Sequence, residues 1–349
     1  MGLRRWGIPW TPLIQVSRST VSVFVRLLRR HSGIMAVIGF SAGLASFLLV
    51  QRQADASRVI AILMLLTWVW LVLEKPIRHL LVVRLGFKLS PYAIKFATQM
   101  VHQESLFFAL PFFFITTTWG APQMLFSALL MAAAAVSIMD PIYHKRIAAN
   151  RWLFPLFHGF SLFALLLVAL PILLHLTTTT SYKLALVVAA LVSAPAVFRA
   201  IQASGWWVLP ARLCLLIALG LAGWSLRPWV PPATLWVTDM TFTHEVSPNR
   251  EPRERLFNVP AADLQAQGLY AYTAVRAPLG LEETIYHEWH HNGVVLDRIA
   301  LQINGGREAG YRSWSRKENF PSEVKGRWDV RVLTEGNQLI GQRTFVVGP

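Results

Sequence analysis

The chain has 349 residues, of which 54% are hydrophobic and 15% are charged, with a formal net charge of +15. This composition excludes a disordered chain and argues against a wholly soluble protein. Residues 1–233 carry 20 Lys and Arg against 4 Asp and Glu, whereas residues 234–349 carry 13 against 14. The basic excess therefore lies in the apolar part, as in the cytoplasmic loops of a membrane protein, and we expect the lipid bilayer and no nucleic acid as a partner.

Residues 1–33 form a basic segment that we expect in the cytoplasm or at the membrane interface. Between Thr11 and Arg30, apolar residues are interspersed with arginines, which suits a helix lying on an anionic leaflet. A plain basic leader fits the same residues equally well. A cleaved signal peptide is not expected, because the basic lead is too long and further spans follow.

A polytopic transmembrane domain is predicted over residues 34–226, as an α-helical bundle of about seven spans. The apolar stretches are Ile34–Val50, Val59–Leu73, Ser105–Trp119, Met124–Met139, Trp152–Leu176, Leu184–Phe198 and Trp207–Leu226. The third stretch reaches a spanning length only if part of the segment Ala97–Glu104 extends it.

The loops predict the orientation. With the N-terminus inside, the cytoplasmic segments carry 15 Lys and Arg and the external segments carry 4, a bias that the positive-inside rule favours. An odd number of spans then places the C-terminal domain outside. The sequence therefore predicts a bacterial inner-membrane protein with a cytoplasmic N-terminus and a periplasmic C-terminal domain. Cys214 is the one cysteine, so no intrachain disulfide can form.

Ionisable and polar groups at membrane depth are functional candidates, because they are costly there. The candidate intramembrane polar site consists of His102, Gln103, Glu104, Asp140 and His158. A carboxylate with a histidine could relay protons or bind a metal. The structural alternative pairs Glu104 and Asp140 with nearby basic residues at the cytoplasmic helix ends, and we favour it.

No motif supports a named chemistry. The chain has no Walker loop, no G-x-S-x-G, no H-E-x-x-H and no C-x-x-C. We therefore assign no catalytic residue, no cofactor and no metal, and we favour a protein that is not an enzyme.

Residues 227–233 form a proline-rich linker, and residues 234–349 then show short β-prone runs. The predicted strands are Leu235–Thr243, Leu269–Val275, Thr284–His290, Val294–Ile303, Gly310–Ser315, Arg327–Thr334 and Leu339–Val347. Asn292-Gly293 is a strong hairpin turn signal. Seven such strands predict an all-β sandwich that is immunoglobulin-like, although other small sandwiches fit as well.

Two clusters in this β-domain are candidate sites. The segment from His287 to His291 could bind a metal, but His287 and His291 on one strand would lie about 13 Å apart, so a Trp-centred core strand is the better interpretation. Aromatic rings and Arg forks suit sugar or peptide ligands. The candidate ligand-binding residues are Trp289, Tyr311, Arg312, Trp314 and Trp328. In the alternative that we favour, Trp314 and Trp328 belong to the core.

These residues carry a resemblance. The patterns His287-x-Trp289-x-x-Asn292-Gly293, Arg312-x-Trp314-Ser315-x-Lys317 and Gly326-x-Trp328-x-Val330 resemble a bacterial domain family of unknown function found at the C-terminal end of envelope proteins. The segment Gln99-x-x-His102-Gln103-Glu104, leading to Leu110-Pro111-Phe112, is similar to the polytopic domain that accompanies it in proteobacterial proteins. The resemblance implies an inner-membrane protein with a periplasmic β-domain and supplies no activity.

Three functional hypotheses follow. In the first, a helical anchor presents a β-domain that binds an envelope glycan, peptidoglycan or a membrane-protein partner. In the second, a membrane-embedded enzyme or transporter uses His102, Glu104, Asp140 and His158, with the β-domain as regulator. In the third, the chain is an accessory subunit of a larger membrane complex.

Overall fold

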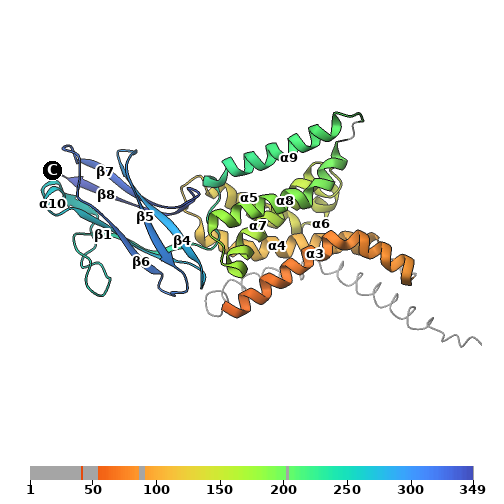
Figure 1. Ribbon diagram of the computed structural model, residues 1–349, viewed down its shortest axis with the longest axis horizontal. Helices are drawn as coiled ribbons and strands as arrows, with labels where there is room; N and C mark the ends of the chain where they lie inside the picture. Colours follow the sequence, from red (N-terminus) through yellow and green to blue (C-terminus); the bar gives the residue numbers. More distant parts are fainter. Residues whose placement is uncertain (1–40, 42–53, 86–90, 202–203, 349) are drawn as a thin grey trace, which may run out of the picture.

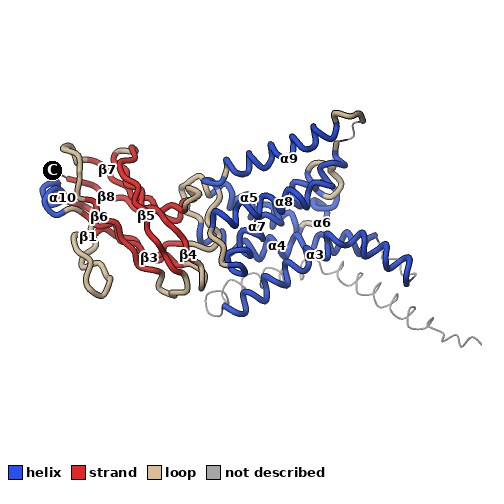
Figure 2. The backbone as a smooth tube through the Cα atoms, in the orientation of Figure 1, coloured by secondary structure: helices blue, strands red, loops and turns tan. Residues whose placement is uncertain are grey.

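The computed structural model describes residues 41, 54–85, 91–201 and 204–348, and it joins a bundle of helices to a domain of β-strands (Figures 1 and 2). The predicted segment 1–33 and the predicted span Ile34–Val50 lie outside the described residues, apart from Ser41. The β-domain lies at one end of the bundle, and the C-terminal end of the chain lies at the far side of the β-domain from the helices (Figure 1).

The helices follow the apolar stretches of the sequence. They are α3 (Ala54–Leu85), α4 (Pro91–Thr116), α5 (Met124–Ile138), α6 (Asp140–Ile142), the π-helical turn η1 (Tyr143–Ile147), α7 (Leu153–Leu174), α8 (Thr178–Ala200) and α9 (Val208–Ser225). The helix α7 is the centre of the bundle, because its residues from Ser161 to Ala169 are all buried. In contrast, almost none of α9 is buried, and it packs mainly against α8.

Three of the helices in the described part of the chain, α7, α8 and α9, are long and apolar enough to cross a membrane. The pair formed by α5 and Asp140–Ile147 adds a fourth if it is counted as one span with a bend of 93°. The predicted stretches Val59–Leu73 and Ser105–Trp119 are helical within α3 and α4, but neither of these helices meets the same criterion, so the number of seven spans stays a prediction. In α4 the polar residues of the segment Gln99–Glu104 lower the mean hydropathy of the helix.

The C-terminal region contains eight strands in two sheets. They are β1 (Trp236–Thr243), β2 (Asn258–Pro260), β3 (Leu269–Arg276), β4 (Glu282–His291), β5 (Val294–Asn304), β6 (Tyr311–Lys317), β7 (Gly326–Thr334) and β8 (Leu339–Gly348). One sheet has the order β1-β3-β6, and the other has the order β2-β8-β7-β4-β5. Every pair is antiparallel except β2 with β8. All seven predicted strands are present, whereas β2 and the short helix α10 (Ala261–Gln267) were not predicted.

Both sheets contribute to one apolar core. It includes Phe242 from one sheet and Trp289, Trp328 and Phe345 from the other, and each is at most 1% exposed. The β4–β5 hairpin turns at Asn292 and Gly293, whose φ angles of 48° and 85° are the left-handed values that an Asn-Gly turn requires. The C-terminal region is therefore a β-domain with two sheets on one core, and its immunoglobulin-like topology stays a prediction.

The helices and the β-domain are connected by more than the linker, in which Arg227–Trp229 forms the 3-10 turn η2. Gln338 Nε2 donates to the carbonyl of Val230 (3.0 Å), and Gln123 Nε2 donates to the carbonyl of Leu339 (2.9 Å). Glu283 at the start of β4 accepts hydrogen bonds from Thr178 at the start of α8. These bonds join one end of the bundle to the β3–β4 and β7–β8 ends of the β-domain.

Candidate functional site

A polar cluster lies inside the bundle, where α3, α4, α7 and η1 meet. His102 on α4 is completely buried, and its two ring nitrogens have separate partners. Nδ1 lies 2.8 Å from the hydroxyl of Tyr143, and Nε2 lies 2.8 Å from Nδ1 of His158 on α7. Of the predicted intramembrane site, the structure therefore brings His102 and His158 into direct contact.

Trp68 and Ser105, which lie beside this pair, were not singled out as site residues in the sequence. Trp68 on α3 lies 4.8 Å from His158 between ring centroids and donates its indole N–H to Ser105 Oγ (2.7 Å). Ser105 in turn donates to the carbonyl of Val101. Tyr143 follows Asp140 by three residues, and this proximity to a predicted site residue is the only sequence signal that pointed to it.

The chemistry of the pair follows from its hydrogen bonds. In the bond between the two imidazoles, one nitrogen donates and the other accepts, so the chain Tyr143–His102–His158 can be oriented in either direction. Phe154 and Phe157 complete the enclosure of the His102 ring at centroid distances of 6.0 Å and 5.4 Å. An aromatic enclosure of this kind stabilises a satisfied polar pair in a dry interior.

The other predicted site residues lie apart from the pair. Asp140 Oδ1 accepts a hydrogen bond from Gln99 Nε2 (2.7 Å), which also donates to the carbonyl of Ser137. Gln103 is buried, and its Nε2 has no hydrogen-bond partner among the described residues. Among the same residues, no hydrogen bond or ion pair joins Glu104 to either histidine. Of the five predicted residues, only His102 and His158 are joined by a hydrogen bond in the described structure, since successive positions on α4 point in different directions.

The histidine-rich strand β4 is part of the core. His287 is fully buried and bonds Thr273 Oγ1 through Nε2 (3.0 Å) and Ser315 Oγ through Nδ1 (2.9 Å). Burial lowers the pKa of His287 to about 3. Trp289 Nε1 donates to the same Ser315 Oγ (3.1 Å). Across the described residues, no group of three or more His, Cys, Asp or Glu side chains is arranged to hold a metal ion.

The predicted ligand-binding residues separate into two sets. Trp289 and Trp328 are completely buried, so in this conformation they are core residues and do not reach a ligand. Trp314 is half-buried and is not part of the apolar core, contrary to the interpretation that we favoured, because on β6 it alternates with the inward-facing Ser313 and Ser315. Arg312, on the same side of β6 as Trp314, bonds Glu251 (3.0 Å). Tyr311 packs against the core and lies under the guanidinium of Arg307.

A polar cleft of about 480 Å³ lies between the end of α4 and the strands β1 and β8, and we call it the junction cleft. Its walls are residues 115–118, 236–240 and 340–343. Trp236 is half-buried there, and Gln342 is exposed. Asp239 holds Arg255 through two bonds of 2.9 Å and 2.7 Å. Arg343 donates to the carbonyl of Met240. Sequence reasoning missed this cleft, because its three wall segments are at least 100 positions apart in the chain.

The walls of the junction cleft combine apolar and polar groups. The indole of Trp236 has the guanidinium of Arg276 over its ring (5.3 Å to the centroid). The amide of exposed Gln342 supplies a donor and an acceptor, while both oxygens of the Asp239 carboxylate already accept from Arg255. Concave sites at the junction between two parts of a protein are common places for small ligands. In the described chain, the cleft therefore combines shape and polarity better than the open surface around Trp314.

Comparisons with known proteins give two family matches. A model described as a family of unknown function, DUF5924, matches residues 14–271, and a model described as a protein of unknown function, DUF2914, matches residues 282–347. The first match ends inside β3, so it includes the bundle together with part of the β-domain. No curated protein and no solved structure matches the chain.

Proposed function

Because the chain belongs to the DUF5924 family, whose function is unknown, we propose its role from geometry: an integral membrane protein that binds an envelope glycan in the junction cleft. The observation that carries this proposal is the position of the cleft, between the end of α4 and the β-domain. A ligand there would contact the helices and the strands together. The helical bundle then serves as an anchor that presents the β-domain at the membrane surface.

The hydrogen bonds between the two parts support the proposal. Three hydrogen bonds limit the freedom of the β-domain relative to the helices. They run from Gln338 to Val230, from Gln123 to Leu339 and from Thr178 to Glu283. A preorganised cleft loses less conformational entropy when it binds a ligand. Peptidoglycan fragments and hydroxyl-rich envelope glycans are the ligand class that fits a Trp face beside amide and carboxylate groups.

Binding tests with the full-length protein in detergent address this function. We expect a soluble peptidoglycan fragment or envelope glycan to bind, and Trp236→Ala or Gln342→Ala to weaken it by about tenfold or more, equal to ~1.4 kcal/mol. Trp314→Ala is the matched control, since it removes an indole from the open face of β6. Absence of binding to every envelope glycan would overturn the proposal. An effect of Trp314→Ala without an effect at the cleft would move the site to β6.

The proposed location is the bacterial inner membrane, with a cytoplasmic N-terminus and a periplasmic β-domain. Its support is the excess of Lys and Arg in alternate loops together with helices that are apolar enough to span. Alkaline phosphatase fused after Pro349 should be active, and green fluorescent protein at the same position should be dark. The opposite result would reverse the orientation and exclude a periplasmic ligand.

A second candidate function is chemistry in the membrane at His102 and His158, and the direct bond between their rings is the observation that favours it. The aromatic enclosure of His102 opposes it, because a substrate would have to displace buried rings. A role as an accessory subunit has no particular observation in its favour.

A further inference from the structure

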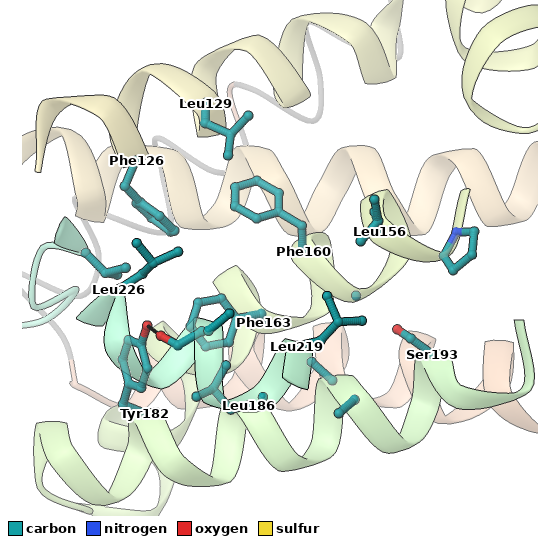
Figure 3. Close-up of a pocket in the computed structure, with 18 of the residues that line it drawn as sticks. Phe126, Leu129, Leu156, Phe160, Phe163, Tyr182, Leu186, Ser193, Leu219 and Leu226 are labelled. Carbon is teal, nitrogen blue, oxygen red and sulfur yellow. Dashed lines mark hydrogen bonds between the residues drawn. The ribbon is translucent and has the colours of Figure 1, made fainter. Parts of the chain in front are cut away.

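A second cavity lies on the side of the bundle, between α9 and the helices α5, α7 and α8, and we call it the lateral cavity (Figure 3). Its volume is about 520 Å³, within the range of small-molecule sites. Its walls are almost entirely apolar, and side chains such as Phe126, Phe163, Leu186 and Leu219 point toward it.

The lateral cavity opens toward lipid. Leu129 on α5 is 56% exposed, Leu156 on α7 is 53% exposed and Leu219 on α9 is 40% exposed, although all three line the cavity. From Tyr182 to Val197 along α8 it extends roughly 22 Å, at ~1.5 Å per residue. That exceeds one leaflet of hydrocarbon, about half of a ~30 Å core. An acyl chain therefore has both access and room.

Two cations lie beside the end of the lateral cavity that is nearest the β-domain. The guanidinium of Arg227 lies 4.1 Å from the ring centroid of Trp224, and Lys183 Nζ lies 5.4 Å from the same centroid. Trp224 packs edge-on against Tyr182, which lines the cavity. The ring of Trp224 thus holds both positive charges next to the cavity mouth.

Neither cation has an acidic partner among the described residues. Arg227 donates only to two carbonyls, those of Gly336 (2.9 Å) and Trp224 (3.1 Å). A partly buried guanidinium without a counter-charge is unfavourable, and a phosphate would form charge-assisted hydrogen bonds with it and with Lys183. The two cations beside an apolar cavity therefore match an amphiphile that has an anionic headgroup and an apolar tail.

We propose that the lateral cavity binds one acyl chain of an anionic phospholipid, whose phosphate lies at Arg227 and Lys183 on the β-domain side of the membrane. The proposal is independent of any ligand in the junction cleft. The lipid would complete the packing between α9 and the bundle, and its phosphate would supply the missing counter-charge beside η2, which joins the bundle to the β-domain.

The first test measures headgroup selectivity. The full-length protein is purified in detergent, mixed with phosphatidylglycerol or phosphatidylcholine of identical chains, and examined by native mass spectrometry. We expect one phosphatidylglycerol per chain, retained about tenfold more than phosphatidylcholine. The double substitution Lys183→Gln and Arg227→Gln should abolish the preference. Equal retention of both lipids by the natural protein would overturn the proposal.

The second test fills the cavity. Gly220 lines it, and a Cβ atom built at Gly220 has no neighbour within 4 Å, so Gly220→Phe can place its ring in the empty volume. We expect it to reduce retention of phosphatidylglycerol at least about tenfold. Leu213→Phe is the matched control, since Leu213 is exposed on the same helix but outside the cavity. Unchanged retention in Gly220→Phe would overturn the proposal.

The first test also addresses another occupant. The apolar stretch Ile34–Val50 of the chain itself is the other occupant to exclude. If that stretch filled the lateral cavity, the full-length protein would retain phosphatidylglycerol no better than phosphatidylcholine, and this result would overturn the proposal.

Discussion

The carboxylate of Glu283 on β4 caps the first turn of α8 through Thr178. Its Oε2 accepts from the backbone N–H of Thr178 (2.7 Å) and from the Thr178 hydroxyl (2.9 Å). The first N–H groups of a helix have no partner within the helix, so an acceptor supplied by another element stabilises its start. Here a residue 105 positions away supplies that acceptor, and the cap becomes a link between the helices and the β-domain.

The first prediction concerns the charge of Glu283. Burial raises its pKa from 4.5 to about 7, although the two bonds from Thr178 lower it and Glu335 raises it further. Because the folded pKa exceeds the unfolded one, the stabilising contribution is present below about pH 4.5 and is lost as pH rises to about 7. Glu283→Gln keeps an acceptor but does not titrate.

Relative to the natural protein, Glu283→Gln should therefore gain stability by about 1.4 kcal/mol per pH unit between pH 5 and pH 7. Hydrogen exchange of the β4 amides at several pH values measures the difference. Glu335→Gln serves as the control, since it removes the neighbouring charge but leaves both bonds from Thr178. A difference that stays constant with pH would show that Glu283 is charged throughout.

The second prediction concerns His287, whose contribution to stability changes with pH in the opposite direction to that of Glu283. Burial lowers the pKa of His287 from 6.5 to about 3. Its contribution is therefore present above pH 6.5 and is lost as the pH falls toward 3, at about 1.4 kcal/mol per pH unit. His287→Gln should make the β-domain less sensitive to acid between pH 6 and pH 4, as measured by guanidinium unfolding. Equal acid sensitivity in both proteins would contradict a neutral, buried His287.

The third prediction separates a structural from a chemical role for the pair in the bundle. His102→Ala leaves a cavity and deprives Tyr143 and His158 of their shared partner, so we expect a loss of about 2–4 kcal/mol in stability. The double change His102→Phe with His158→Phe removes both polar rings together and should restore most of the stability that His102→Ala loses. The temperature of aggregation in detergent measures the stability of the single and the double variant. A double variant that stays as unstable as His102→Ala would contradict a purely structural role for the pair.

The fourth prediction compares two tryptophans that the sequence grouped together. Trp328 is completely buried, donates to the carbonyl of Val324 (2.8 Å) and stacks on Phe345. Trp328→Ala should therefore cost about 3–5 kcal/mol. Trp314→Ala, on the outer side of β6, should change stability by less than about 1 kcal/mol. Similar losses in the two variants, measured by hydrogen exchange in β7, would place both rings in one core.

Local pattern was sufficient for most of the longer helices and strands. Apolar runs predicted helices at Trp152–Leu176 and Leu184–Phe198, where α7 and α8 lie, because lipid or a buried core requires continuous apolar residues. Alternation and the Asn292-Gly293 signal predicted the β4–β5 hairpin, because a two-residue turn pairs the strands on either side of it. The register shift between Trp289 and His290 was not predicted. The three-residue strand β2 was missed, since it pairs with β8 and has no periodic pattern of its own.

The sequence by itself determined which residues are apolar, where the chain changes from helices to strands and in which part of the chain the excess positive charge lies, since these depend on side-chain type and short spacing. Only the tertiary structure decided that His102 bonds His158 and not Glu104, that Trp328 is core while Trp314 is not, and that Glu283 caps α8. Both cavities and the two cations on Trp224 also belong to this second group. All of these features have one physical cause. Each is formed by elements that are distant in the chain, and the packing of whole helices and sheets decides which of those elements come together.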